Sequence, residues 1–71
     1  MNERITTDPK VLAGQPVIRG TRIPVYLILE LLAAGNSRED ILSQYPQLRD
    51  EDITAAMEYA SHILKGEVLE A

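Results

Sequence analysis

The chain has 71 residues, no cysteine and a formal net charge of −4, so it forms one small domain, residues 1–71, without disulfides or thiolate metal sites. A domain of this size buries only about 60% of its unfolded surface, which favours self-association or a partner, and its apolar stretches fall short of the roughly 20 residues of a membrane span. We therefore expect a soluble cytoplasmic protein with no cofactor, no bound metal and no membrane contact.

A short strand and a hairpin are expected at the N-terminal end, over residues 4–24. The strand is expected from Arg4 to Thr7, where it could also pair with a second copy. In the hairpin, residues 17–18 favour a strand, the Gly20-Thr21 pair suits a type II′ turn, and residues 22–23 form the returning strand. Pro24 then ends the pairing and occupies the first position of a helix.

The basic residues are concentrated at this hairpin end. Residues 1–24 carry four basic and two acidic side chains, a balance of +2, whereas residues 25–71 carry three basic and nine acidic ones, a balance of −6. Arg19 and Arg22 flank the hairpin turn and could bind an anion such as a phosphate. Ordinary solvated arginines are the alternative interpretation.

The first of three helices expected over residues 25–66 runs from Pro24 to Ala34 and is apolar on nearly every side. Such a helix must be covered on more than one face, and so small a domain has few elements to cover it. We expect Leu29 and Leu32 to pack against a second copy. Burial inside the monomer is the alternative.

The second helix is expected between Ser37, which caps it, and Pro46, which stops it. Asp40 lies three residues after Ser37 and forms a weaker version of the capping box. A helix, a short Gly-Asn turn and a second helix are typical of a three-helix DNA-binding unit, but also of a generic helical hairpin.

The third helix is expected to begin near Arg49 or Asp50 and to end at Gly66, before a tail at residues 67–71. The acids at residues 50–52 complement the helix dipole but would repel DNA phosphates at a recognition helix. Asp50 could serve as the cap of a helix that starts one residue later. Arg49 would then contact a phosphate or a partner's carboxylate, with solvent exposure as the alternative.

Two sets of site residues follow from these patterns. The polar residues of the hairpin and of the outer face of the third helix are the expected contacts to DNA, and the apolar residues of the first helix and of the tail are the expected interface with a second copy or a partner. The expected DNA contacts are Arg19, Thr21, Arg22, Arg49, Thr54 and Lys65. The expected interface residues are Leu29, Leu32, Val68 and Leu69.

The chain from Ile5 to about Leu64 resembles the bacterial domain-of-unknown-function family 433. The resemblance rests on the run GQPVIRGTRIPV at residues 14–25, and on shorter matches at residues 8–9, 32–37, 45–48, 52–53, 56 and 59–60. It implies a small, mainly α, homeodomain-like fold with three helices in a helix-turn-helix arrangement, here with an N-terminal strand and hairpin. It also implies a gene beside a PIN-type nuclease toxin, for which family members are described as antitoxins.

The resemblance favours one function and leaves a second open. The first is an antitoxin and DNA-binding autoregulator that acts as a homodimer, binds operator DNA and binds a PIN-like toxin encoded nearby. In that case an arginine, from Arg4, from Arg49 or from near Lys65, would enter the acidic active site of the toxin. The alternative is a protein–protein interaction module of such a pair that does not bind DNA, which the net negative charge favours.

An enzyme is not expected, and we predict no catalytic residue. Nucleophile and base arrangements need a His, Cys or Lys close to a partner. The only histidine, His62, is expected on the outer face of the third helix near its end, where a surface role is favoured.

Overall fold

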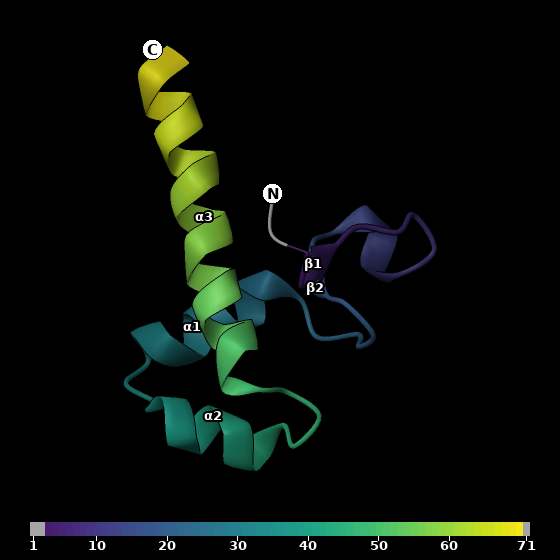
Figure 1. The fold of residues 1–71 in the computed structure, drawn as a ribbon, viewed down its shortest axis with the longest axis vertical. Helices are drawn as coiled ribbons and strands as arrows, with labels where there is room; N and C mark the ends of the chain where they lie inside the picture. The colour runs from purple at the N-terminus through teal and green to yellow at the C-terminus, as the bar shows by residue number, and fades with distance from the viewer. Residues whose placement is uncertain (1–2, 71) are drawn as a thin grey trace.

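A computed structural model describes the backbone of residues 3–70 and the side chains of residues 3–66. Two strands and a short 3-10 helix precede three helices, and Figure 1 shows α1 and α2 around the first part of the long helix α3, with the strands to one side. The fold is therefore the expected small, mainly α domain with an N-terminal β element. The elements are β1 (Ile5–Thr6), η1 (Leu12–Gly14), β2 (Val17–Ile18), α1 (Val25–Ala33), α2 (Arg38–Gln44) and α3 (Asp50–Glu70).

The two strands pair with each other inside one chain. β1 runs antiparallel to β2, with Ile5 opposite Ile18 and Thr6 opposite Val17. The strand is shorter than the expected residues 4–7, and this pairing buries Ile5, Val17 and Ile18. Ile5 and Ile18 belong to the core that the helices form and thus anchor the N-terminal segment on them.

The turn after β2 is not the expected type II′ turn around Gly20-Thr21. The N–H of Thr21 donates to the carbonyl of Ile18 at 3.0 Å, so Arg19 and Gly20 are its two central residues. Gly20 has a φ of +82°, which is the conformation of the third residue of a type II turn and favours glycine. Arg19 therefore stands at the tip of the turn.

The returning strand expected at residues 22–23 is also absent from the structure. The Thr21 hydroxyl donates to the carbonyl of Ile18 at 2.8 Å and accepts the N–H of Ile23 at 3.0 Å. The two sides are joined by an isolated bridge between Val17 and Pro24, in which the N–H of Ile18 donates to the carbonyl of Ile23 at 3.0 Å and the N–H of Val25 donates to the carbonyl of Pro16 at 2.9 Å. The hydroxyl satisfies backbone groups locally and so replaces part of a strand ladder.

The start of α1 differs from the sequence prediction. Pro24 is extended (φ −74°, ψ 151°) and lies just before the helix instead of at its first position. Leu29 and Leu32 are partly buried against the core of their own chain. Gly35, with a φ of +95°, follows the end of α1 as expected.

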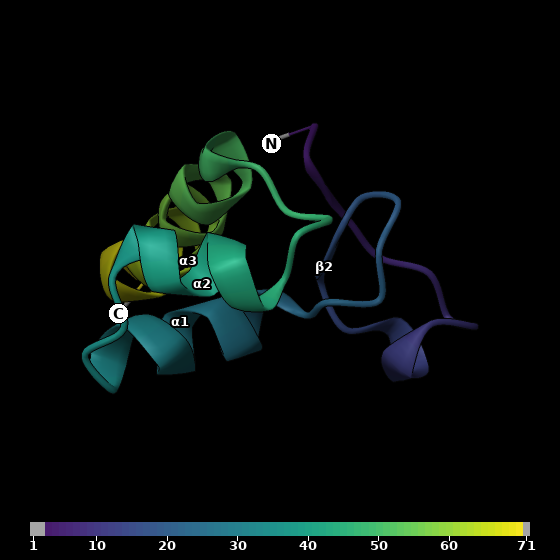
Figure 2. The same ribbon diagram turned by 90° about the horizontal axis from the view of Figure 1, so that it is seen from below.

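The core lies where all three helices meet. Ile28 of α1, Ile41 of α2, and Ile53 and Ala56 of α3 are fully buried. Figure 2, seen from below, shows the three helices gathered on one side and the strands with η1 on the other. Each helix contributes one isoleucine to the centre, so the packing depends on all three.

The ends of α2 and α3 show one correct and one wrong prediction. The Ser37 hydroxyl accepts the N–H of Asp40 at 3.0 Å, and the Asp40 carboxylate accepts the N–H of Ser37 at 3.0 Å, which confirms the capping box. In contrast, α3 does not end at Gly66 but continues to Glu70, so residues 67–70 are helical. A helical glycine loses only about 1 kcal/mol relative to alanine, and no proline follows to stop the helix. The side chains of Val68 and Leu69 lie outside the described residues.

Along the described chain, no helix combines the length and the apolar character that crossing a membrane requires.

Candidate functional site

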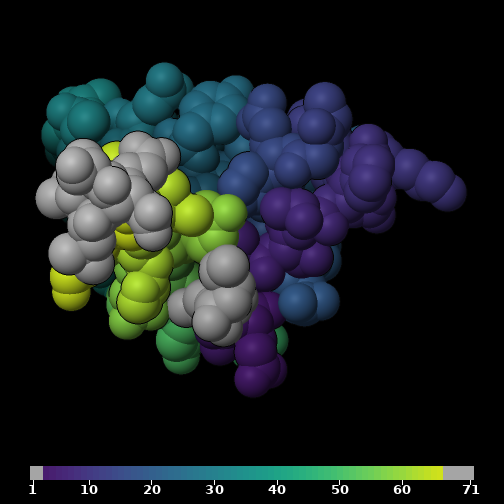
Figure 3. Space-filling view, turned by 90° about the horizontal axis from the view of Figure 1, so that it is seen from above, coloured from purple at the N-terminus to yellow at the C-terminus, as the bar shows by residue number. Residues whose placement is uncertain are grey.

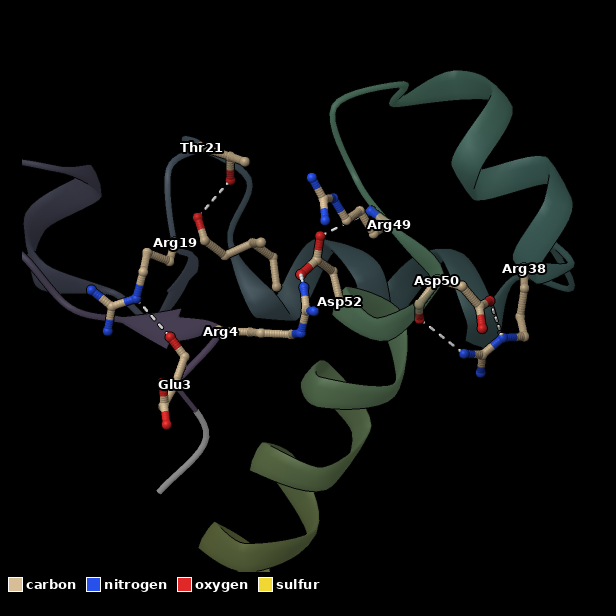
Figure 4. A network of polar contacts seen from close by, with 9 residues as sticks. Glu3, Arg4, Arg19, Thr21, Arg38, Arg49, Asp50 and Asp52 are labelled. Carbon is tan, nitrogen blue, oxygen red and sulfur yellow. Dashed lines mark hydrogen bonds and ion pairs between the residues drawn. The ribbon is translucent and has the colours of Figure 1, made fainter.

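A polar hollow of about 790 Å³ opens where the hairpin turn meets the start of α3. Three segments far apart in the sequence supply its arginines: Arg4 precedes β1, Arg19 stands in the turn, and Arg49 precedes α3. Figure 4 shows these three side chains together. The arginine-lined hollow, as we call it, is lined by Glu3, Arg4, Arg19, Gly20, Thr21, Gln47, Arg49 and Asp52.

Asp52 is the buried carboxylate that joins two of these segments. Its side chain is 7% exposed and accepts Nη1 of Arg4 at 3.0 Å. Its second oxygen accepts the backbone N–H of Arg49 at 2.9 Å, as the acid of a capping box does. Arg49 therefore occupies the capping position and α3 begins at Asp50, so the expectation that Asp50 is the cap is wrong.

Arg19 is fixed at the rim of the hollow by the backbone. Its Nε donates to the carbonyl of Glu3 at 2.6 Å, and its main-chain N–H donates to the carbonyl of Arg4 at 2.7 Å. The residue itself is exposed. An anchored guanidinium loses less side-chain entropy when it binds a ligand, because its position is already set.

Arg49 is the arginine of the hollow with the greatest freedom to bind. It is exposed, and within residues 3–66 its guanidinium makes no hydrogen bond or ion pair. A guanidinium carries five N–H donors in a planar fork that matches phosphate and carboxylate oxygens. The loop before α3 thus presents a cation beside the hollow.

The acidic start of α3 is largely neutralised inside the chain. Asp50 accepts Nε of Arg38 at 2.7 Å, and Nη2 of Arg38 donates to the carbonyl of Asp50 at 3.0 Å and to the Thr54 hydroxyl at 2.6 Å. Because Asp52 pairs with Arg4, Glu51 is the acid of residues 50–52 for which the structure shows no cationic partner among the described side chains. The repulsion expected between this helix start and phosphate is correspondingly reduced.

The Arg38–Asp50 pair shifts the pKa values of both side chains. The hydrogen bond from Arg38 lowers the pKa of the Asp50 carboxyl below its ordinary value and raises the pKa of Arg38. We expect the substitution Arg38→Met to return the pKa of Asp50 to its ordinary range, as measured by NMR titration of the Asp50 carboxyl from neutral to acidic pH. A midpoint unchanged by the substitution would contradict the pairing.

The sign of the linked stability change follows from that direction. Since the pKa of Asp50 is lower in the folded than in the unfolded state, the contribution of the pair is present above the unfolded-state pKa. It is lost as the pH falls through the folded-state pKa. The Arg38 side chain is 37% exposed and the Asp50 side chain 61%, so solvent screens the pair and the change in stability is expected to be small.

The structure brings some of the expected DNA contacts together and separates others. Arg19, Thr21 and Arg49 line the hollow, although the Thr21 hydroxyl is engaged by its own turn. The remaining three lie elsewhere: Arg22 is exposed outside the lining, Thr54 is bound to Arg38, and Lys65 is exposed farther along α3. Lys65 is 16 residues from Arg49, or about 24 Å of helix.

Sequence reasoning did not assign Arg4, Gln47 and Asp52 to this site. Asp52 was interpreted only through the helix dipole, and its partner Arg4 lies 48 residues earlier. The one local signal for Asp52 is its spacing of three residues after Arg49, which matches the acid of a capping box. Among the described residues, no group of three or more His, Cys, Asp and Glu side chains could hold a metal ion.

A second feature is an apolar groove of about 380 Å³ between α1 and the second half of α3. Leu29, an expected interface residue, is part of its wall, whereas Leu32 is not. The apolar groove, as we call it, is lined by Gln15, Pro16, Val25, Tyr26, Leu29, Tyr59, Ala60, Ile63 and Leu64.

Comparison with known proteins gives consistent results. Residues 5–60 match the family described as "Protein of unknown function (DUF433)". The uncharacterized protein y4eO of Sinorhizobium fredii is 47% identical over 58 residues, which cover 82% of this chain and 26% of that protein. An uncharacterized protein of Archaeoglobus fulgidus is 65% identical over 23 residues, which cover 32% of this chain and 64% of that protein. In both cases the match spans less than two thirds of the relative.

The structure is also similar to a solved one. The crystal structure of a DUF433 member protein from Anabaena variabilis aligns with a TM-score of 0.81 and 34% sequence identity. The alignment covers 94% of this chain and 66% of that chain. Both the helices and the N-terminal β element therefore fall almost entirely within the shared fold.

Proposed function

The chain belongs to the DUF433 family of proteins of unknown function, and we propose that it is a homodimeric, cytoplasmic DNA-binding autoregulator whose arginine-lined hollow contacts the phosphates of operator DNA. The observation that carries this proposal is the convergence of Arg4, Arg19 and Arg49 on one hollow. Arginine forks bind phosphate oxygens bidentately, and neutralised phosphates release counterions, which favours association.

The local charge supports the proposal although the whole chain is acidic. Three arginines and two acids, Glu3 and Asp52, line the hollow, which gives a balance of +1 against −4 for the whole chain. Asp52 is buried and paired with Arg4, so its charge is largely compensated. A phosphate at the hollow therefore meets the exposed guanidinium groups of Arg19 and Arg49 first.

The resemblance extends the proposal to a protein partner. We propose that the protein is the antitoxin of a PIN-like toxin encoded nearby and that an arginine enters the acidic active site of that toxin. Arg4 is bound by Asp52, whereas the exposed Arg49 has no partner among the described side chains, which favours Arg49 for this role. We propose no enzymatic activity for the chain itself, since its only histidine, His62, is exposed on α3.

The alternative is an interaction module that binds a protein partner and never DNA. The apolar groove favours this alternative, because uncovered apolar surface is typical of protein–protein contacts. Binding to promoter DNA distinguishes the two functions.

We expect the protein to bind a labelled fragment of its own promoter more tightly than a scrambled fragment of equal length. Across a salt series, the logarithm of the affinity should fall steeply with the logarithm of the salt concentration. Arg19→Ala and Arg49→Ala should each weaken binding and reduce this slope by about 1, because each removes a phosphate contact.

Arg22→Ala is the matched control, since Arg22 is an exposed arginine of the same hairpin that does not line the hollow. A smaller loss in this variant supports contact through the hollow, and an equal loss would mean that the whole hairpin makes the contact. Absence of promoter preference in the wild-type protein, alone and with the toxin, would favour the interaction module.

A further inference from the structure

The two helices that form the apolar groove differ greatly in length. α1 has 9 residues and α3 has 21, or about 13 Å and about 31 Å. Figure 1 shows α3 extending past α1 and α2, and Figure 3, seen from above, looks onto the yellow-green part of this extension. Ile63 and Leu64 in this part are 43% and 60% exposed, and Tyr26 across the groove is 53% exposed.

The lining of the groove has the composition of the centre of a protein–protein interface. Aliphatic and aromatic side chains from both helices face the same space, and none of the lining residues carries a charge. Interface centres are depleted in charged residues and enriched in tyrosine. Its principal members are Tyr26, Leu29, Tyr59, Ala60, Ile63 and Leu64.

The exposed area is larger than a lone domain of this mass requires. The chain exposes 4966 Å², whereas a monomeric globular protein of 7.9 kDa exposes about 4,400 Å². The excess of roughly 550 Å² is close to the approximately 600 Å² that each partner buries in the smaller stable interfaces. A single contact at the lower end of this size range would therefore remove it.

We propose that a second copy of this chain occupies the apolar groove, so that the α3 ridge formed by Ile63 and Leu64 of each protomer packs into the groove of the other. The same stretch of α3 forms both the ridge and one wall of the groove, so each copy offers both surfaces, as a two-fold contact requires. Because the lining carries no charge, two copies of the same groove do not repel each other, and no partner of opposite charge is needed. This inference rests on the homodimer of the proposed function and assigns its interface.

Sedimentation equilibrium of the full chain without DNA tests this inference. The wild-type protein should show a reversible monomer–dimer equilibrium, with a limiting mass twice the 7.9 kDa of one chain. Leu64→Glu should raise the dimer dissociation constant at least tenfold, because it would bury a carboxylate without a partner. Tyr26→Lys, on the opposite wall, should have a similar effect, and both residues are exposed enough in the monomer for folding to persist.

Leu12→Glu is the matched control, because it makes the same substitution at a leucine that is 40% exposed but outside the lining. This variant should dimerise like the wild type. A wild-type protein that remains a folded monomer at all concentrations, with circular dichroism showing its helices, would overturn the inference. So would equal weakening by Leu12→Glu, or a dimer that survives both groove substitutions.

Promoter titrations separate this inference from the proposed function. The wild-type protein could bind the promoter with a salt dependence that Arg19→Ala and Arg49→Ala reduce, yet never dimerise. That result would overturn the groove contact alone. A wild-type protein that dimerises, loses its dimer on Leu64→Glu and itself has no affinity for the promoter would overturn DNA binding. The groove contact would then remain supported. A monomer that places a purified toxin in the groove would show that the groove belongs to a different protein and would overturn the inference.

Discussion

Ile53→Ala is expected to lower the free energy of unfolding by about 3 kcal/mol, within the range for a buried isoleucine cut back to alanine. Ile53 is fully buried and belongs to the same core as Ile28 and Ile41. A domain of 71 residues has a total stability of only about 4–10 kcal/mol, so the loss removes a large part of it. Urea unfolding followed by circular dichroism should show a lower midpoint with an unchanged slope.

Met57→Ala is the control for this prediction, because Met57 lies one turn farther along α3 and is 39% exposed. Its effect should stay below about 1 kcal/mol. Both variants are best made in the Leu64→Glu background, so that dimer dissociation does not contribute to the measured stability. Similar losses at both positions would mean that the stability does not depend on a core centred on Ile53.

Asp52→Ala is expected to lower the free energy of unfolding by about 2–3 kcal/mol. The substitution removes the partner of Arg4 and the acceptor for the N–H of Arg49 in one step. Breaking a fully buried ion pair takes about 3–5 kcal/mol, and the value here is smaller because the Arg4 side chain is 40% exposed and can be solvated. Thermal and urea unfolding measure the loss.

Two further variants separate the parts of this effect. Asp52→Asn retains an oxygen for the N–H of Arg49 but loses the charge, so we expect about half of the loss. Glu51→Ala removes an exposed acid one residue earlier, whose contribution is limited to about 0.3–1 kcal/mol through the helix dipole. If Glu51→Ala were as destabilising as Asp52→Ala, helix-dipole electrostatics and not the Arg4 contact would explain the role of the acids.

Local signals in the sequence were sufficient to predict the helices. The capping box at Ser37 and Asp40, the glycine after α1 and the proline after α2 each act within a few residues, so their effect can be deduced without tertiary information. The end of α3 was missed because Gly66 is only a weak helix breaker. Leu12 and Ala13 adopt φ values of +50° and +58°, and no residue type in that segment indicates them.

The hairpin shows how a side chain can override a strand pattern. Residues 22–23 suit a strand by composition, but the Thr21 hydroxyl bonds the backbone on both sides of the turn. This local satisfaction moved the turn one residue earlier and placed Arg19 at its tip. Propensity scales count residue types and omit such side-chain bonds.

The candidate site was only partly predictable for a different reason. Arg19 and Arg49 were singled out by their charge and their position beside a turn or a helix start. Their neighbour Arg4 depends on Asp52, and no local rule connects residues that are 48 positions apart. The pairing of Arg38 with Asp50, which reduces the acidity of the start of α3, likewise joins two different helices.

The contact between Arg4 and Asp52 joins two ends of the domain that are synthesised at different times. The 48 residues between them take about 2–10 s to synthesise at about 5–20 residues per second, so the arginine emerges long before its carboxylate. The hydrophobic core of the nascent chain stays incomplete until Ile53 and Ala56 have been synthesised. The second half of α3 is made after them and adds no fully buried residue among those described. The residues of the fully buried centre have thus all been synthesised before Ile63 and Leu64, the exposed residues of the α3 ridge.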